Sequence, residues 1–217
     1  MNEVVRAKVK KIIFLLIAAV IFGVILFPPV VLFLTSIKTE LDALSFPPKW
    51  IFKPTLENYT EIFEFSPFAR YLLNSFIVAS LNTGVVLVLG SFAAYSLARF
   101  RFKGADDIAF WILSVRMMPP VAAIIPIYII MRNLRLLDTP WSLVITYLTF
   151  NLPFAVWMMR SFFREIPREI EESALVDGCS IFRSFRSIAL PLVAPGLAAT
   201  GILTFIFSWN EFLFALI

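Results

Sequence analysis

The chain has 217 residues, of which 60% are hydrophobic and 24 are Phe, and its mean hydropathy is +0.87. This apolar content exceeds what one small soluble core can bury, so we expect the chain to fold in lipid. The chain has no His and a single Cys, Cys179, which excludes zinc sites, His-dependent triads and an intramolecular disulfide. We interpret the net charge of +4 as a membrane-topology signal rather than as a nucleic-acid footprint.

Five hydrophobic runs are predicted to be membrane helices. They cover residues 12–34, 71–98, 108–130 and 141–159, and a fifth run begins near Leu190 and is still apolar at Ile217. The first run contains 23 uncharged residues, which reach ~34 Å as a helix. Because it is longer than the apolar core of a signal peptide and no small-x-small cleavage site follows it, we expect it to stay uncleaved. The predicted fold class is an all-α, polytopic membrane helical bundle.

The Lys and Arg residues predict how the chain is oriented. Residues 1–11, 99–107 and 160–189 hold 12 of them, whereas residues 35–70 and 131–140 hold 6. Basic residues accumulate in cytoplasmic loops, so we expect a cytoplasmic N-terminus and a multi-pass chain in the cytoplasmic (inner) membrane of a prokaryote. Five spans would leave the last residue outside, and the uncharged ending predicts a truncated chain or a missing further helix.

Residues 160–191 form a charged interruption where a short polar turn would have joined two spans. Pro167 suits the first turn of a helix, and the acidic residues that follow favour the positive end of its dipole. Gly178 can end this helix after about three turns with a left-handed cap. Ser180 can then cap a second short helix. The sequence therefore predicts two short helices that meet at Gly178.

The first of these helices carries small residues that would let another backbone come close. They are Ser173, Ala174 and Gly178. We predict that this face docks into the groove of a partner protein. The alternative is an amphipathic helix on anionic lipid headgroups, but headgroups would repel the three acidic residues Glu169, Glu171 and Glu172.

The spacing within the segment carries a family resemblance. Glu172-Ser173-Ala174 is followed after three residues by Gly178, and after nine more by Ile188-Ala189-Leu190-Pro191. This resembles the EAA loop of ABC importer permeases, whose pattern is E-A-A, three residues, G, nine residues and I-x-L-P. The one departure is Ser173 in place of Ala, which keeps the side chain small. Further stretches, such as A-Y-S-L-A-R at 94–99 and F-S-W-N-E-F at 207–212, are similar to the MalG-like permeases of carbohydrate importers, and the likeness covers almost the whole chain.

This resemblance implies a type I ABC importer permease fold with six spans, of which the sequence lacks the last. Residues 1–69 would hold the N-terminal tail, the first helix and an extracytoplasmic loop. Residues 70–217 would form a C-terminally incomplete permease core with the coupling loop at 160–191. In this family the loop docks on a separate ATPase and passes its ATP-driven closure to the membrane helices in alternating access. Carried over by position, the residues of the ATPase-coupling loop are Glu171, Glu172, Ser173, Ala174, Asp177, Gly178, Ile188, Leu190 and Pro191.

The resemblance also implies a set of partners. They are a second permease subunit in a heterodimer, two copies of an ATP-binding subunit, an extracytoplasmic solute-binding protein and a sugar or related polyol as substrate, with membrane lipid around the spans and no nucleic acid. The chain has no P-loop pattern, so we expect a transport subunit without enzymatic activity, cofactor or metal, and ATP hydrolysis on the separate subunit. The alternative is a secondary transporter or channel subunit without ATPase coupling, but such proteins need intramembrane acids, whereas the acids of this chain lie in loops or at Glu211.

Polar or helix-breaking residues inside the predicted spans are candidates for the translocation pathway. They are Arg116, Met118, Pro119 and Asn151. An unpaired charge at the position of Arg116 costs ~2.5–3.5 kcal/mol on insertion scales, so its side chain must face protein, water or a headgroup. Broken helices are tolerated in membranes where they are buried or line a cavity. The alternatives, a snorkelling Arg116 and ordinary packing kinks, stay open from the sequence.

Overall fold

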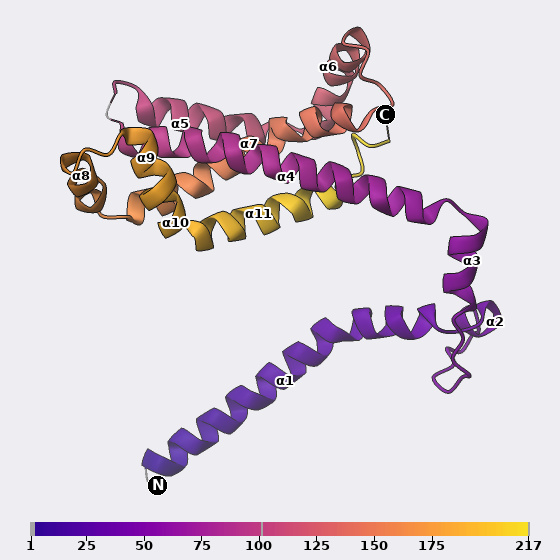
Figure 1. Ribbon diagram of the computed structural model, residues 1–217. Coiled ribbons are helices and arrows are strands. Elements are labelled where there is room, and N and C mark those ends of the chain that lie inside the picture. Colours follow the sequence, from indigo (N-terminus) through magenta and orange to yellow (C-terminus); the bar gives the residue numbers. More distant parts are fainter. Residues whose placement is uncertain (1–2, 101, 217) are drawn as a thin grey trace. The chain divides into compact units, whose positions relative to one another are not determined.

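The computed structural model describes residues 3–100 and 102–216, and the regular structure within these ranges is entirely helical (Figure 1). This confirms the predicted all-α class. Three helices of the described part are long and apolar enough to cross a membrane, and two bent helix pairs raise the number to five if each pair is one span. The chain divides into two compact units, Met1–Arg70 and Tyr71–Ile217, which we describe separately.

The first unit holds one long helix and two short ones. These are α1 (Glu3–Ser36), α2 (Glu40–Ala43) and α3 (Glu57–Phe65). The Asn58 amide donates to the carbonyls of Ser36 (2.9 Å) and Lys38 (2.7 Å), which ties α3 to the end of α1. Lys49 Nζ donates to Asp42 Oδ1 at 2.6 Å, and this hydrogen bond lowers the pKa of the Asp42 carboxyl. The connection after α1 is therefore held by specific polar contacts.

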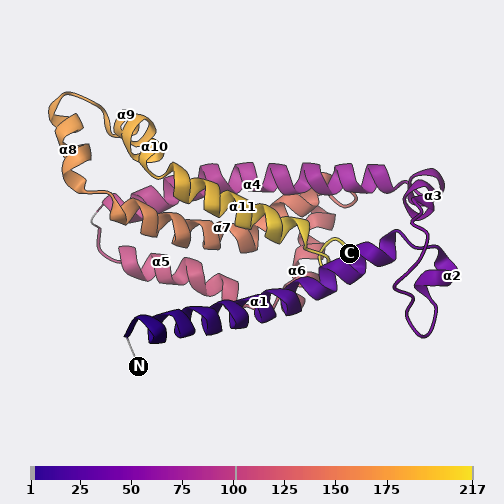
Figure 2. The same cartoon turned by 90° about the horizontal axis from the view of Figure 1, so that it is seen from below.

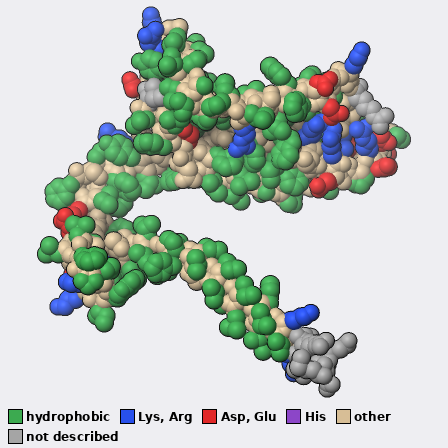
Figure 3. Space-filling view, turned by 180° about the vertical axis from the view of Figure 1, so that it is seen from behind, with side chains coloured by type: hydrophobic (Ala, Val, Ile, Leu, Met, Phe, Trp, Pro, Cys, Tyr) green, Lys and Arg blue, Asp and Glu red, His purple; other side chains and the backbone are tan. Residues whose placement is uncertain are grey.

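The second unit is a bundle built around three long helices. It contains α4 (Phe68–Arg99, from Tyr71 on), α5 (Ala105–Ser114), η1 (Val115–Met117), α6 (Pro120–Asn133), α7 (Pro140–Glu165), α8 (Arg168–Val176), α9 (Ile181–Ser184), η2 (Phe185–Ala189), α10 (Leu190–Leu192) and α11 (Ala194–Trp209). The helices α4, α7 and α11 lie side by side in both ribbon views (Figures 1 and 2). On the face shown in Figure 3, hydrophobic side chains cover these helices and most charged side chains gather at the end that carries α8. This distribution suits a bundle surrounded by lipid.

Small residues let the long helices approach closely. A Cβ at Gly196 of α11 would lie 2.4 Å from ring atoms of Phe162 in α7. A Cβ at Gly90 of α4 would lie 3.2 Å from Cβ of Ala155, also in α7. Membrane helices are held together by such close packing, because lipid is as apolar as their own side chains.

The third and fifth hydrophobic runs are bent. The axes of Ala105–Met117 and Pro120–Asn133 make an angle of 95°, and Pro119 and Pro120 lie at the break, where neither has an N–H to continue the helical ladder. Near the start of the fifth run, the chain bends by 75° between the helical segments Ile181–Leu192 and Ala194–Trp209. The sequence predicted the first break from the same prolines.

An aromatic cluster fills the end of the bundle next to α8. The Tyr95 ring of α4 lies 4.8 Å from the Phe185 ring of η2 and 5.4 Å from the Phe163 ring of α7. All three side chains are buried, with Met159 and Ala189 in the same cluster. This cluster joins α4, α7 and η2 where the charged segment begins and ends.

Candidate functional site

The charged segment begins with α8, and the predicted helix from Pro167 to Gly178 is confirmed. Gly178 has a φ of +87°, the left-handed conformation expected of it. Its N–H donates to the Leu175 carbonyl at 3.1 Å, and the Cys179 N–H donates to the Ala174 carbonyl at 2.9 Å. These two bonds make a Schellman motif, which satisfies two carbonyls of the last turn and needs a residue that tolerates positive φ.

A second short helix follows, as predicted. Ser180 Oγ accepts the Arg183 N–H at 3.3 Å and so caps α9. The chain then widens into the π-helical turn η2, where the Leu190 N–H donates to the Phe185 carbonyl five residues earlier. Pro191 follows directly, within α10. The segment thus links α7 to α11 through two short helices with an irregular joint before the bend into α11.

One face of α8 is buried and the other is free. The residues Glu171 and Ala174 are 6% and 7% exposed. Most of the other positions are exposed, namely Glu169, Ile170, Glu172, Ser173, Leu175, Val176, Asp177 and Gly178. In both ribbon views α8 lies beyond the ends of α4 and α7 (Figures 1 and 2). Its outer face is therefore open to a partner.

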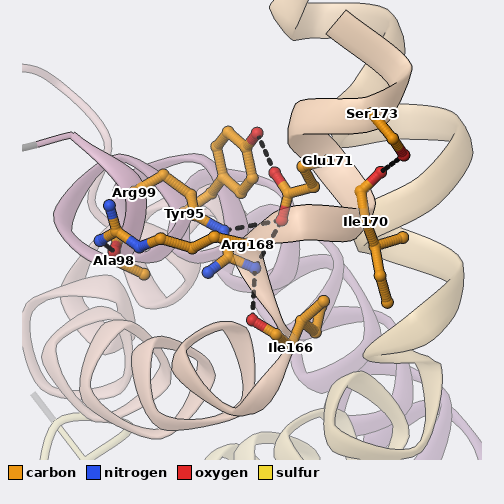
Figure 4. A network of polar contacts seen from close by, with 8 residues as sticks. All are labelled: Tyr95, Ala98, Arg99, Ile166, Arg168, Ile170, Glu171 and Ser173. Atoms are coloured by element: carbon orange, nitrogen blue, oxygen red, sulfur yellow. Dashed lines mark hydrogen bonds and ion pairs between the residues drawn. The ribbon is translucent and has the colours of Figure 1, made fainter. Parts of the chain in front are cut away.

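The buried Glu171 carboxylate is bound by two residues of α4 (Figure 4). Tyr95 Oη donates to Glu171 Oε2 at 2.6 Å, and Arg99 Nε donates to Glu171 Oε1 at 2.7 Å. A second Arg99 nitrogen lies 2.5 Å from the same Oε1. The Arg99 and Glu171 side chains are 9% and 8% exposed, so this is a buried ion pair with both carboxylate oxygens engaged.

Two further hydrogen bonds join the end of α4 to the start of the charged segment, one donated from each side. Arg99 donates to the carbonyl of Ile166, just before α8, at 3.2 Å. Arg168, the first residue of α8, donates to the carbonyl of Ala98 in the last turn of α4 at 3.1 Å. A cation at the N-terminus of a helix is unfavourable for that helix, but here Arg168 meets the negative C-terminal end of α4 instead. Together with the Glu171 contacts, these bonds hold α8 and the residue Ile166 before it against the end of α4.

The predicted coupling residues lie in three environments. Glu171 and Ala174 face the bundle, whereas Glu172, Ser173, Asp177 and Gly178 are exposed. Ile188 and Leu190 are half-buried at the joint before α11, and Pro191 is exposed.

Sequence reasoning missed Tyr95, Arg99 and Arg168 as part of this site. The A-Y-S-L-A-R stretch could have indicated that Tyr95 and Arg99 act together, because residues four apart project from the same side of a helix.

The candidate pathway residues do not all lie together. Arg116 and Asn151 line one cavity of about 380 Å³, together with Tyr147, Glu211 and other side chains of α7 and the α11 end. The Arg116 guanidinium lies 4.6 Å from the ring centre of Phe154 and 4.9 Å from that of Phe207. Cation–π contacts of this kind stabilise a cation away from water. Met118 and Pro119 are exposed at the break before α6 and do not line the cavity.

Asn151 also belongs to a buried polar cluster. Its Nδ2 donates to Asn82 Oδ1 at 2.9 Å and to Ser208 Oγ at 3.0 Å, and Asn82 Nδ2 donates to the Val144 carbonyl at 2.9 Å. The cluster joins α4, α7 and α11 in the middle of the bundle. The Asn151 side chain therefore makes hydrogen bonds to two neighbouring helices and also lines the cavity.

Comparison with known proteins adds a family context. The model of the family described as binding-protein-dependent transport system inner membrane component matches residues 86–217. The chain is 39% identical over 208 residues to a probable ABC transporter permease protein of Sinorhizobium fredii, with 96% of this chain and 75% of that protein covered. It is 34% identical over 215 residues to the trehalose/maltose transport system permease protein of Thermococcus litoralis, with 98% and 77% covered.

A solved structure has the same fold. It is a chain of a bacterial ABC transporter involved in the import of the acidic polysaccharide alginate, and it superposes with a TM-score of 0.80 at 22% identity. The superposition covers 99% of this chain and 75% of that one. At this identity the likeness concerns the fold, which is that of an ABC importer permease, as the spacing of residues 172–191 predicted.

Proposed function

Because the chain belongs to the family of binding-protein-dependent transport system inner membrane components, it is a permease of an ABC importer, and we propose that it moves a sugar or related polyol by alternating access. The sugar assignment is supported by relatives named for trehalose and maltose transport. The energy comes from ATP hydrolysis on a separate subunit, since no P-loop pattern is present in the sequence.

Coupling to that ATPase takes place through the segment 160–191. The observation that carries this proposal is the exposed face of α8, on which Glu172, Ser173, Asp177 and Gly178 lie together at the end of the bundle. A short exposed helix that carries carboxylates together with the apolar side chains of Leu175 and Val176 fits the groove of another protein. Because α9, η2 and α10 join it to α11, a rotation of the docked helix becomes a tilt of a membrane helix.

The working assembly contains a second permease, two ATP-binding subunits and an extracytoplasmic solute-binding protein. With α8 in the cytoplasm, the N-terminus is cytoplasmic and the loop 35–70 is extracytoplasmic, in agreement with the Lys and Arg bias of the loops. The solute-binding protein then meets the side that carries α2 and α3.

The translocation pathway passes the cavity that Arg116 and Asn151 line. Arg116 has no carboxylate within ion-pair distance in the described part of the chain, so its N–H groups are free to bind hydroxyl oxygens of a sugar. Aromatic side chains beside it, Phe150 and Phe207, suit the apolar faces of such a ring. Met118 and Pro119 shape the pathway indirectly, by ending the helix beside Arg116.

The docking assignment is tested with Gly178→Trp and Glu172→Lys in the reconstituted importer. Both changes alter the exposed face of α8, so we expect uptake and substrate-stimulated ATP hydrolysis to be lost while membrane insertion is retained. Glu165→Lys is the matched control, because it makes the same charge change at an exposed position at the end of α7, outside α8 and the EAA pattern. Normal uptake and normal ATPase stimulation in both variants would rule out docking through this face.

A further inference from the structure

We infer that Glu171 is a positioning residue, which with Tyr95 and Arg99 forms a latch between α8 and the end of α4. Through this latch, a displacement that a partner imposes on α8 also moves α4. The inference deepens the proposed coupling function and rests on it for the identity of the partner. The latch is defined here as the ion pair Arg99–Glu171 and the hydrogen bond Tyr95–Glu171.

The chain connects α8 directly to α7 and, through α9, η2 and α10, to α11, but it does not connect α8 to α4 in this way. Tyr95 and Glu171 are 76 residues apart in sequence, and Arg99 and Glu171 are 72 apart. A push on α8 therefore reaches α7 and α11 through covalent linkage, whereas α4 can follow only through side-chain contacts. The polar contacts between α8 and α4 are the latch and the Arg168–Ala98 hydrogen bond, among the residues that the structure describes.

The geometry of the latch makes it stiff. Tyr95 holds one Glu171 oxygen and Arg99 holds the other, so the carboxylate cannot rotate without losing a bond (Figure 4). The burial of both charges opposes separation, because an open latch would leave each charge without its partner in a site poor in water. The Tyr95 ring is itself fixed between Phe163 and Phe185. A small movement of α8 is thus carried to α4 rather than absorbed by flexible side chains.

Glu171 and its neighbour Glu172 have different roles in the proposed coupling. Successive residues on a helix are about 100° apart, so the two carboxylates point in different directions. Glu171 is 6% exposed and faces α4, while Glu172 is exposed on the docking face. A change at Glu172 should weaken the contact with the ATPase. A change at Glu171 should leave that contact intact but reduce how much of the α8 displacement reaches α4.

The holding function of the latch is tested on the full-length protein in liposomes. A nitroxide on the native Cys179, the single Cys, reports the motion of the end of α8 by electron paramagnetic resonance. We expect Glu171→Gln, and the milder Tyr95→Phe, to shorten the rotational correlation time, while Glu169→Gln leaves it unchanged. The double variant should be no more mobile than Glu171→Gln alone, because both changes open one latch. Unchanged spectra in both single variants would overturn the latch.

The transmitting function is tested in the importer assembled with its ATPase subunits. For Glu171→Gln and Tyr95→Phe we expect uptake per ATP hydrolysed to fall about fivefold or more, the lower range of coupling between sites. Crosslinking from Cys179 to the ATPase should persist in these variants and be lost in Glu172→Lys. If uptake, hydrolysis and crosslinking fall together, Glu171 has a general structural role and the inference is wrong. A wild-type protein that neither crosslinks to nor stimulates the ATPase would instead refute the proposed function, and the spectra would still decide whether the latch holds.

Discussion

At the scale of single residues, the charged segment 160–191 places side chains that are adjacent in sequence in different environments. Glu171 ends in a buried ion pair with Arg99, while Glu172 is exposed one position later. Gly178 differs from both glutamates because its role is to adopt a backbone conformation that other residues rarely take. Its φ of +87° closes α8 and turns the chain toward α9.

Substitutions at Gly178 should separate backbone strain from steric block. A Cβ there would have no atom within 4 Å, so Gly178→Ala costs only the left-handed conformation, ~1–2 kcal/mol. Gly178→Asn should cost less, because Asn tolerates this conformation. Thermal unfolding of the protein in detergent checks the order Gly, Asn, Ala. An Ala variant as stable as the wild type would contradict the Schellman cap.

At the scale of helices, the second unit combines close backbone contacts with a few buried polar bonds. Gly196 and Gly90 let α11 and α4 approach α7, and the cluster of Asn82, Asn151 and Ser208 joins all three helices. In lipid these contacts determine how the helices pack, since apolar surface alone does not favour one helix neighbour over lipid.

Gly196→Ala should destabilise the contact between α7 and α11. The new Cβ would meet atoms of the Phe162 ring at 2.4 Å, so either the ring or a helix must move, at a cost of ~1–3 kcal/mol. Gly84→Ala is the matched control, because no atom lies within 4 Å of a Cβ there and Ala is the better helix former. The prediction is measured as unfolding in detergent, and Phe162→Leu should partly restore stability to Gly196→Ala. Equal stability of the two Gly variants would argue against the close packing.

Asn151→Ala should also weaken the bundle, by a smaller amount. It removes the hydrogen bonds to Asn82 and Ser208, and such bonds between membrane helices contribute ~0.6–1.7 kcal/mol. Thr149→Ala serves as the control on the same helix, since its hydroxyl bonds only the local Thr146 carbonyl. The difference in unfolding free energy between the two variants measures the network. No difference would mean that Asn151 acts in the cavity alone.

At the scale of the whole molecule, the charged segment 160–191 lies at one end of a bundle whose face in Figure 3 is largely apolar. This arrangement requires α8 to lie in water beyond the membrane, because its exposed face carries carboxylates. The orientation of the chain decides which compartment that is.

The proposed orientation is tested by labelling single cysteines in intact cells. A membrane-impermeant maleimide should leave the native Cys179 unlabelled until the membrane is permeabilised. In a Cys179→Ser background, Glu64→Cys on the exposed surface of α3 should be labelled from outside. The opposite pattern at the two positions would reverse the topology and place α8 away from any cytoplasmic ATPase.

The sequence alone was enough for the features that depend on local chemistry and on the lipid. Apolar runs must be helical in a membrane, which predicted the all-α class, and the proline pair after Met118 predicted a break. The caps at Gly178 and Ser180 were predictable because their hydrogen bonds are made within a few residues. The spacing from Glu172 to Pro191 likewise indicated the permease fold that the comparisons confirm.

Only the tertiary structure decided which side of α8 faces the bundle. A helix of that sequence has acidic residues on several sides, and no local rule tells which carboxylate is buried. The partner of Glu171 lies more than 70 residues earlier, so the pairing exists only once α4 and α8 are packed together. For the same reason, the packing of Arg116 between Phe154 and Phe207 was beyond sequence reasoning. Buried charges need specific partners, and the fold supplies those partners from distant parts of the chain.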